Sequence, residues 1–283
     1  MNIGILGQGR LGSQLASHLR SCNNSVTTWS RGLEPRESKD KNLQDISKHS
    51  FSELEVLIVA SGSSSPATST PEEELARTWN LVHTQMESFR GNVFYLSSGA
   101  VYGNTLRPVS ELDAVSAVTP YGCAKIAVEK VFNDSVGGRF TSLRIGNIFP
   151  MNHDFGIFQM IYNRINQGAK VTLFGNPDDC RDYLAEQDLI RLLSQIITLS
   201  GLPEAINIGS GKSLPLRFFE SEISKYSRGE IRCLWQKRNS FDVSSTFLDN
   251  SLLREITGTE VGDPTNQISD FLRTTVFDSD KSR

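Results

Sequence analysis

Residues 1–19 read MNIGILGQGRLGSQLASHL. A short apolar run, NIGIL, is followed by a glycine turn and then by a segment in which leucine recurs at helical spacing. The glycines at positions 7, 9 and 12 form GxGxxG between this expected strand and helix, where glycine lets the backbone approach a pyrophosphate. The stretch predicts a dinucleotide-binding unit, although such a turn could also serve strand–helix packing alone. Its candidate cofactor contacts are Gly7, Gly9, Arg10, Leu11 and Gly12.

The end of the second expected strand bears on which dinucleotide is bound. In NAD-binding units an acidic residue about 20 positions after the glycine turn binds the ribose 2′-hydroxyl. Here the strand at residues 25–29 leads into Ser30 and Arg31, and Arg10 lies within the glycine turn. A hydroxyl and guanidinium groups suit the 2′-phosphate of NADP. We therefore expect NADP, with NAD as the alternative, and both arginines could instead be solvated surface groups.

Two apolar runs indicate a sheet that is covered on both faces. LEVLIVA at residues 54–60 and NVFYLSS at residues 92–98 are too apolar for half-exposed strands. Between them, the capping signals Thr70, Pro71 and Glu73 predict one helix from Thr70 to about residue 89. Strands that alternate with helices predict an α/β fold with a doubly wound parallel sheet of the Rossmann type. Ala60, which ends the first run, joins the candidate cofactor contacts.

The alternation of strands and helices changes after Pro150. Up to that point we expect a dinucleotide-binding core, residues 1–150, whose last strand runs through FTSLRIGNIF at residues 140–149. Residues 151–283 are expected to form mainly a small substrate-binding lobe, with 183–210 returning to the core sheet. Because no Pro/Gly/Ser-rich linker divides the chain, this lobe is interpreted as interleaved with the sheet rather than as a separate domain.

Composition excludes several classes of partner. The 283 residues carry a formal net charge of −3 and show no basic surplus, so we expect no nucleic-acid partner. No apolar run approaches the ~20 residues of a membrane span, and the start lacks the features of a signal peptide. The four cysteines show no CxxC spacing and the four histidines are scattered, so we expect reduced thiols, a cytoplasmic location and no metal.

TPYGCAKIAVEK at residues 119–130 has the start signals of a helix and carries a tyrosine and a lysine one helical turn apart. Tyr121 and Lys125 are four residues apart, so their side chains can project from one helix face. A cation beside a phenol favours the phenolate, which would make Tyr121 a usable proton donor and acceptor near neutral pH. Since YxxxK pairs also arise by chance, other parts of the chain must decide.

A third motif, SSGAVYG at residues 97–103, follows a predicted strand. With Tyr121 and Lys125, it resembles the extended short-chain dehydrogenase/reductase family of nucleotide-sugar epimerases, dehydratases and ketoreductases. The resemblance covers nearly the whole chain. Further matching pieces, in the family's order and spacing, are Asn80, Arg144, Asn147, RDYLAEQDL at residues 181–189 and INIGSG at residues 206–211.

The resemblance implies a catalytic set of Ser98, Tyr121 and Lys125. Tyr121 would exchange a proton with a sugar oxygen while a hydride moves to or from the nicotinamide. Lys125 would bind the nicotinamide ribose, and both residues therefore also count as cofactor contacts. Ser98, rather than Ser97, would hydrogen-bond the reacting oxygen and so contact the substrate.

The resemblance also implies substrate contacts in the second half of the chain. Asn147 and Arg181 match positions that commonly contact the substrate diphosphate, for which a guanidinium group is well shaped. The alternative for Arg181 is a structural ion pair with Asp182 or Asp188.

Three departures from the family pattern narrow the expected activity. The glycine motif is one residue shorter than the usual GxxGxxG, and the chain is short between Pro150 and Phe174. SSGAVYG also lacks the Asp-Glu pair of the 4,6-dehydratases, which disfavours dehydration. We therefore expect an NADP-dependent reductase of a nucleotide-linked keto sugar, a 4-keto-6-deoxy hexose. The alternatives are an NAD-dependent nucleotide-sugar epimerase and a non-catalytic regulatory protein that binds NADP; a hydroxyacid dehydrogenase fits the glycine turn alone.

The resemblance extends to assembly. The helices expected from residue 70 and from residue 119 resemble the pair that forms a four-helix interface in this family, which implies a homodimer. The alternative is that their apolar faces simply cover the sheet.

Overall fold

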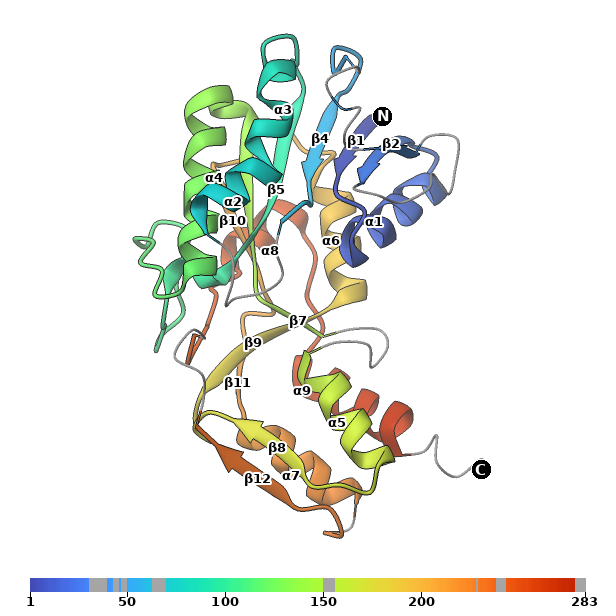
Figure 1. The fold of residues 1–283 in the computed structure, drawn as a ribbon, viewed down its shortest axis with the longest axis vertical. Coiled ribbons are helices and arrows are strands. Elements are labelled where there is room, and N and C mark those ends of the chain that lie inside the picture. Colours follow the sequence, from blue (N-terminus) through green and yellow to red (C-terminus); the bar gives the residue numbers. More distant parts are fainter. Residues whose placement is uncertain are drawn as a thin grey trace.

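The computed structural model describes residues 1–30, 40–42, 46, 50–62, 70–149, 156–227, 229–237 and 243–277. A seven-stranded sheet with the order β10-β6-β5-β4-β1-β2-β3 forms the upper part of the molecule in Figure 1. Its strands are β1 (Asn2–Leu6), β2 (Ser25–Ser30), β3 (Asp40–Asn42), β4 (Val56–Val59), β5 (Asn92–Ser98), β6 (Phe140–Ile145) and β10 (Ala205–Ile208). Each neighbouring pair is parallel, so the carboxyl ends of these strands meet at one edge.

Helices cover both faces of this sheet (Figure 1). One face carries α1 (Arg10–Ser21), α6 (Glu186–Ile196) and α8 (Ser251–Thr257), and the other carries α2 (Pro71–Arg77), α3 (Trp79–Met86) and α4 (Pro120–Val136). In β4, Val56 and Ile58 pack into the first core while Leu57 and Val59 pack into the second. This alternation explains why the strand has an unbroken apolar sequence. The predicted doubly wound parallel sheet is confirmed.

A smaller part lies below the carboxyl edge of the sheet. It contains a three-stranded sheet of β11 (Ser213–Pro215), β9 (Cys180–Ala185) and β7 (Asn147–Phe149), and a two-stranded sheet of β12 (Cys233–Gln236) and β8 (Val171–Phe174). Its helices are α5 (Gly156–Asn166), α7 (Arg217–Tyr226) and α9 (Pro264–Phe271), the last continuing into a π-helical turn, Leu272–Phe277. The rings of Phe158, Tyr183 and Phe219 pack edge to face at the centre of its core.

The single helix predicted from Thr70 to residue 89 is wrong, because it is divided in two. Thr70 does cap the first part, since its hydroxyl accepts from the Glu73 amide at 3.2 Å. At Thr78, however, the backbone leaves the helical region, with φ −124° and ψ −82°. The Thr78 hydroxyl donates to the carbonyl of Glu74 at 2.7 Å. Such back-bonding by threonine competes with the regular helix ladder and bends helices, so α2 ends before α3 begins.

The single strand predicted at residues 140–149 is also two strands. β6 ends at Ile145 in the large sheet, and β7 begins at Asn147 and pairs with β9 in the small one. The chain therefore changes sheets at Gly146. Apolar residues continue through both strands, so hydrophobicity carried no signal of the division.

A buried carboxylate joins the two parts of the molecule at this point. Asp182 of β9 is fully buried and accepts hydrogen bonds from the amide and hydroxyl of Ser210, each at 2.8 Å. The amides of Gly211 and Leu248 donate to its other oxygen at 3.2 and 3.4 Å. Burial raises the pKa of Asp182 to about 6, although these hydrogen bonds act in the opposite direction. The carboxylate thus fastens β9 to the loop after β10 and to the segment before α8.

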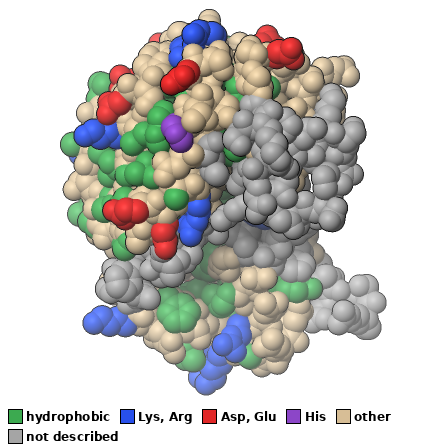
Figure 2. Space-filling view, turned by 45° about the horizontal axis from the view of Figure 1, so that its top comes forward, with side chains coloured by type: hydrophobic (Ala, Val, Ile, Leu, Met, Phe, Trp, Pro, Cys, Tyr) green, Lys and Arg blue, Asp and Glu red, His purple; other side chains and the backbone are tan. Residues whose placement is uncertain are grey.

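The surface combines both signs of charge. On the face shown in Figure 2, acidic and basic side chains of the described residues are interspersed. No helix within the described ranges is long and apolar enough to cross a membrane. In the same residues, no group of three or more His, Cys, Asp or Glu side chains could hold a metal ion. All four cysteines are free thiols.

Asp182→Asn should lower the free energy of unfolding by about 1 to 3 kcal/mol, because the new amide group would face two backbone N–H donors and leave them unsatisfied. Denaturant unfolding followed by circular dichroism measures the change. Asp270→Asn, at a carboxylate that is 71% exposed beside Arg273, is the matched control and should change stability by less than about 0.5 kcal/mol. Equal changes in the free energy of unfolding for the two substitutions would mean that Asp182 does not stabilise the protein by joining its two parts.

Candidate active site

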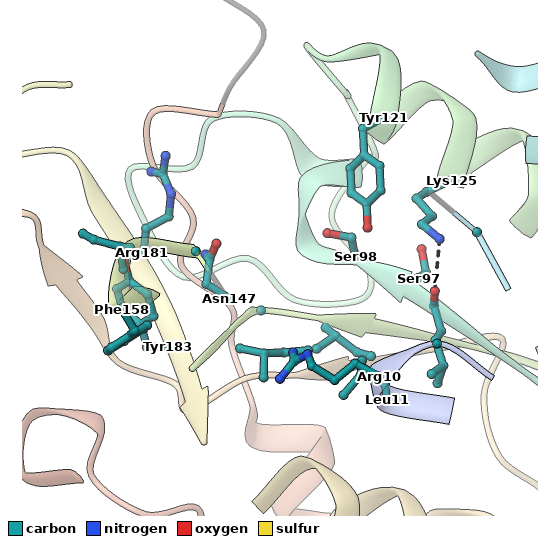
Figure 3. Close-up of a pocket in the computed structure, with 18 of the residues that line it drawn as sticks. Arg10, Leu11, Ser97, Ser98, Tyr121, Lys125, Asn147, Phe158, Arg181 and Tyr183 are labelled. Atoms are coloured by element: carbon teal, nitrogen blue, oxygen red, sulfur yellow. Dashed lines mark hydrogen bonds between the residues drawn. The ribbon is translucent and has the colours of Figure 1, made fainter. Parts of the chain in front are cut away.

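A cavity of about 810 Å³ lies between the carboxyl edge of the large sheet and the small lobe (Figure 3). Its wall is contributed by the glycine turn, the ends of β4 and β5, the start of α4, the β6–β7 junction, α5, β8 and β9. The sequence-predicted site residues that line it are Gly9, Arg10, Leu11, Gly12, Ala60, Ser98, Tyr121, Lys125, Asn147 and Arg181. Gly7, which is half-buried, is not among the lining residues. The structure therefore brings residues from distant parts of the sequence around one space.

The three glycines of the turn have different environments. A Cβ on Gly7 would lie 2.6 Å from the amide nitrogen of Ser61, and Gly7 also has a positive φ of 110°. A Cβ on Gly12 would lie 1.9 Å from the carbonyl oxygen of Gly7. Gly9 has no neighbour within 4 Å of its Cβ position and faces the cavity. The first and third glycines thus permit close packing, while the second leaves open space at the N-terminus of α1, the kind of place where phosphate groups bind in other doubly wound folds.

Of the residues expected at the adenosine ribose, only Arg10 has a described side chain. Its guanidinium forms an ion pair with Glu186 at the start of α6, and the Glu186 side chain is 1% exposed. Ser30 is the last residue of β2, and nothing is described of its side chain. Arg31 lies outside the described residues. Arg10 therefore connects the glycine turn to α6.

Ser98, Tyr121 and Lys125 lie close together at the centre of the cavity wall. Ser98 ends β5, and its hydroxyl accepts a hydrogen bond from the amide of Ala100 at 3.2 Å. Tyr121 lies in the first turn of α4, and Lys125 follows one turn later with its Nζ 5.4 Å from the centre of the Tyr121 ring. The hydroxyl of Tyr121 points toward Ser98 (Figure 3). A substrate oxygen between the two hydroxyl groups could receive hydrogen bonds from both.

Lys125 also has a partner that the sequence analysis missed. Its Nζ donates to Glu74 Oε1 of α2 at 3.0 Å, and both side chains are buried, at 5% and 1% exposed. It also donates to the carbonyl oxygen of Leu96 at 3.3 Å (Figure 3, dashed line). Burial opposes the charge of the ammonium, but Tyr95, Tyr121 and Glu74 together raise the pKa of Lys125 above its ordinary value. Lys125 is therefore a cation with a fixed position.

A signal for Glu74 was present in the helix periodicity. Met86, Val82 and Thr78 are buried at four-residue steps along α3 and the junction before it. Extending this spacing by one more step reaches Glu74, where an apolar residue would be expected on a face that packs against the protein. A carboxylate at such a position indicates a buried partner, although not which one.

The side chains of the two serines of SSGAVYG, Ser97 and Ser98, point in different directions. Ser97 faces away from Ser98, as strand neighbours do, and its hydroxyl donates to Glu129 Oε1 at 2.5 Å. Glu129 also binds Arg144 of β6 at 2.9 Å. Arg144 in turn donates to the hydroxyl of Tyr102 at 2.8 Å. These buried groups form a polar network that includes Ser97, whereas Ser98 lies outside this network beside Tyr121.

Asn147 and Arg181 line the side of the cavity next to the small lobe. The Asn147 amide donates to the hydroxyl of Thr246 at 3.2 Å. The guanidinium of Arg181 donates to the carbonyl oxygens of Val243 and Ser244. Arg181 thus holds the chain segment that begins at Val243, a contact that neither of the two expectations for this residue included.

Aromatic side chains of the small lobe complete the cavity. Phe158 of α5 and Tyr183 of β9 line it below Asn147 (Figure 3), and Phe174 of β8 lies at its edge with 52% of its surface exposed. The sequence analysis did not assign these residues to the site, because their positions depend on how the small sheets pack. Apolar and aromatic walls with a few polar groups are typical of small-molecule sites.

The fold and the cavity define an α/β protein in which a glycine turn lies next to a Ser-Tyr-Lys group, and comparison with known proteins gives the family. The model of the NAD-dependent epimerase/dehydratase family matches residues 4–209. The chain belongs to this family, and the resemblance drawn from SSGAVYG and YGCAK is confirmed.

Individual relatives represent more than one activity. The dTDP-4-dehydro-6-deoxyglucose reductase of Escherichia coli is 29% identical over 132 residues, which are 44% of this chain and 42% of that protein. The UDP-glucose 4-epimerase of Halalkalibacterium halodurans is 23% identical over 215 residues, 67% of this chain and 64% of that protein. The chain spans about half the length of the curated relatives that it matches, from 42% to 64%.

Solved structures show the same fold over the whole chain. A UDP-glucuronic acid 4-epimerase mutant from Bacillus cereus, in complex with UDP-4-deoxy-4-fluoro-glucuronic acid and NAD, has a TM-score of 0.83 at 19% identity. The match covers 100% of this chain and 99% of that one. At this level of identity the likeness concerns the fold.

Gly12→Ala should weaken the binding of both NADPH and NADH at least about tenfold, because the added Cβ would displace the carbonyl of Gly7 and with it the turn. Fluorescence titration with each cofactor measures the change. Gly138→Ala is the matched control, since an added Cβ there meets nothing within 4 Å, and it should leave binding unchanged. Undiminished binding by the Gly12 variant would mean that the turn does not hold the cofactor.

Proposed function

We propose that the protein is an NADP-dependent reductase of a nucleotide-linked keto sugar, a 4-keto-6-deoxy hexose. The observation that carries this proposal is the convergence of Ser98 and Tyr121 on a cavity that also reaches the glycine turn. The 29% identity to a dTDP-4-dehydro-6-deoxyglucose reductase supports the choice of substrate. The absence of the dehydratase Asp-Glu pair from SSGAVYG supports reduction over dehydration.

In this proposal each of the three polar residues has one task. Tyr121 donates its phenolic proton to the carbonyl oxygen of the sugar, and Ser98 hydrogen-bonds the same oxygen to stabilise the charge that develops there. Lys125 holds the nicotinamide ribose and supplies positive charge near Tyr121. The bound nicotinamide cofactor supplies the hydride. Gly9, Leu11, Gly12 and Ala60 are the proposed backbone contacts of this cofactor.

We assign recognition of the NADP 2′-phosphate to Arg31 and Ser30, at the end of β2. Arg10, the other arginine considered for this phosphate, is paired with Glu186. It is therefore better suited to order the glycine turn near the pyrophosphate than to select between cofactors. The proposed preference for NADP rests mainly on Arg31.

Residues 151–283 are the proposed substrate lobe, with 183–210 returning to the core formed by residues 1–150. Asn147 and Arg181, which face the cavity beside this lobe, are the proposed contacts of the nucleotide diphosphate. The aromatic wall around Phe158 and Tyr183 would enclose the rest of the nucleotide sugar.

Assembly and location complete the proposal. We propose a homodimer in which the segment 70–89, which contains α2 and α3, and α4 pack against the same helices of a second copy, because the corresponding pair forms the interface in the family that the sequence resembles. Free thiols and a soluble cofactor pool are consistent with a cytoplasmic enzyme.

An NAD-dependent nucleotide-sugar 4-epimerase is the second candidate. Two observations favour it. The ion pair between Arg10 and Glu186 removes one of the two arginines that suggested NADP. Three curated relatives are named as UDP-glucose epimerases. A non-catalytic NADP-binding protein remains the third reading, but it would not need Ser98, Tyr121 and Lys125 around one space.

Incubation of the purified protein with NADPH and dTDP-4-keto-6-deoxyglucose tests the three candidates together. The reductase should consume NADPH in proportion to the deoxy sugar formed. An epimerase should instead carry tightly bound NAD and interconvert UDP-glucose and UDP-galactose with no net use of added cofactor. Cofactor binding without either reaction would favour the regulatory protein and contradict the proposal.

Tyr121→Phe should leave NADPH binding nearly unchanged but reduce turnover by about 10² to 10⁴, the range typical of a lost acid–base group. Steady-state kinetics and cofactor titration of the same preparation measure the two quantities. The retained cofactor binding is the internal control for folding. Full activity of this variant would eliminate the proposed proton path.

Arg31→Ala should weaken NADPH binding about tenfold and leave NADH binding nearly unchanged, because only NADPH carries the phosphate that the guanidinium would bind. The difference should become smaller in high salt. Arg232→Ala, at an exposed arginine of the small lobe, is the control and should affect neither cofactor. Equal losses for both cofactors, or a preference of the unmodified protein for NADH, would overturn the assignment of NADP.

A further inference from the structure

Glu74 lies behind Lys125 as seen from the cavity. Lys125 lines the cavity, whereas Glu74, 1% exposed, does not. The carboxylate of Glu74, on α2, lies 3.0 Å from the ammonium of Lys125, although the two residues are 51 positions apart in the sequence. Glu74 can therefore act on a bound molecule only through Lys125.

Among the described residues, the other groups that contact Lys125 are neutral. From β5 it meets the carbonyl of Leu96 at 3.3 Å and the ring of Tyr95 at 4.8 Å, and the hydroxyl of Tyr95 donates to Glu74 at 3.3 Å. From α4 it meets the ring of Tyr121 at 5.4 Å. The next acidic residue on α4, Glu129, is engaged with Arg144. Among the described residues, Glu74 is thus the anion that faces Lys125 directly.

This pairing changes what Lys125 does to Tyr121. A lone ammonium in a buried site strongly stabilises a nearby phenolate. An ammonium paired with a carboxylate presents a weaker field, because the negative charge offsets part of the potential of the positive charge. The Ser-Tyr-Lys set alone therefore gives an incomplete account of the charge near Tyr121.

We infer that Glu74 is a positioning residue that fixes Lys125 and neutralises much of its charge, so that Tyr121 keeps its proton to a higher pH and favours reduction. This inference rests on the proposed function, because protonated Tyr121 is the form that donates to a keto sugar. A lone lysine would favour the phenolate, which is the form needed to abstract a proton in the oxidative direction. The Glu74–Lys125 pair thus biases the site toward the reductive direction.

A spectroscopic titration tests this inference without a nucleotide sugar. Ultraviolet absorbance reports tyrosinate formation, and the contribution of Tyr121 is the difference between each protein and the same protein carrying Tyr121→Phe. In Glu74→Gln the Tyr121 phenolate should form at a pH lower by roughly one unit than in the unmodified protein. Glu73→Gln, at a half-exposed neighbour on the same helix, is the control and should give no shift. No shift in Glu74→Gln, or a shift to higher pH, would overturn the inference.

Because Glu74→Gln leaves a buried ammonium without its counter-charge, this variant could fail to fold. Lys125→Met and the double substitution Glu74→Gln/Lys125→Met provide a second comparison that avoids an unpaired cation. With Lys125 removed, the carboxylate alone should delay ionisation of Tyr121 to a higher pH than in the unmodified protein. Adding Glu74→Gln should reverse that delay. Identical titrations of the single and double variants would overturn the inference.

The same titration separates this inference from the proposed function. If Glu74→Gln shows the shift but no keto sugar is reduced, the charge-balancing role of Glu74 stands and the reductase proposal fails. If NADPH-dependent reduction is observed, its loss at high pH should begin about one unit lower in Glu74→Gln than in the unmodified protein. Reduction with an unchanged pH profile would overturn the role of Glu74 while leaving the reductase intact.

Discussion

The close approach of β1 and β4 at their carboxyl ends is the constraint on which the site depends. The strand order turns here, because β1 has β2 on one side and β4 on the other. The backbone after β4 comes so near to Gly7 that a Cβ there would lie 2.6 Å from the Ser61 nitrogen. A turn of this tightness lets α1 begin at the carboxyl edge and return along one face of the sheet, and it leaves a crevice at the switch point, where nucleotides bind in doubly wound folds. The remaining wall of the cavity is arranged around this crevice.

One face of α4 supplies the reactive side chains that line this crevice. Tyr121, Lys125 and Glu129 follow at four-residue steps and therefore lie along one side of the helix. Glu129 is bound to Arg144 of β6 and to the hydroxyl of Ser97 of β5, so the far end of this face is tied to two central strands. Fixing the helix there also fixes where Lys125 and Tyr121 enter the cavity. A buried ion pair of this kind fixes the positions of its two side chains, but it is weak evidence for a gain in folding stability.

Local patterns in the sequence predicted the sheet, the glycine turn and the shared helix face of Tyr121 and Lys125, because strand alternation and i, i+4 spacing act over a few residues. The grouping of Ser98 with these two residues was implied by the family resemblance of SSGAVYG and not by local spacing. The pairs that refine the site are long-range: Glu74 and Lys125 are 51 residues apart, and Arg10 and Glu186 are 176 apart. Nothing in a single sequence connects such residues. The apolar residues Ile145 and Ile148 on either side of the junction also gave no sign that the chain changes sheets at Gly146. The fold class was thus more predictable than the electrostatics of the site.

The ion pair of Arg10 with Glu186 has a consequence for cofactor recognition. If Arg10 left Glu186 to bind a 2′-phosphate, a carboxylate that is 1% exposed would lose the guanidinium paired with it. Arg10 is 28% exposed, so a contact between its guanidinium and a phosphate would be weakened by solvent, whereas the pair with Glu186 involves a buried carboxylate. The ion pair therefore favours leaving Arg10 with Glu186. In the proposed NADP-dependent enzyme, selection for the 2′-phosphate is therefore assigned to Ser30 and Arg31, which come at the end of β2 and directly after it in the sequence, while Arg10 connects the glycine turn to α6.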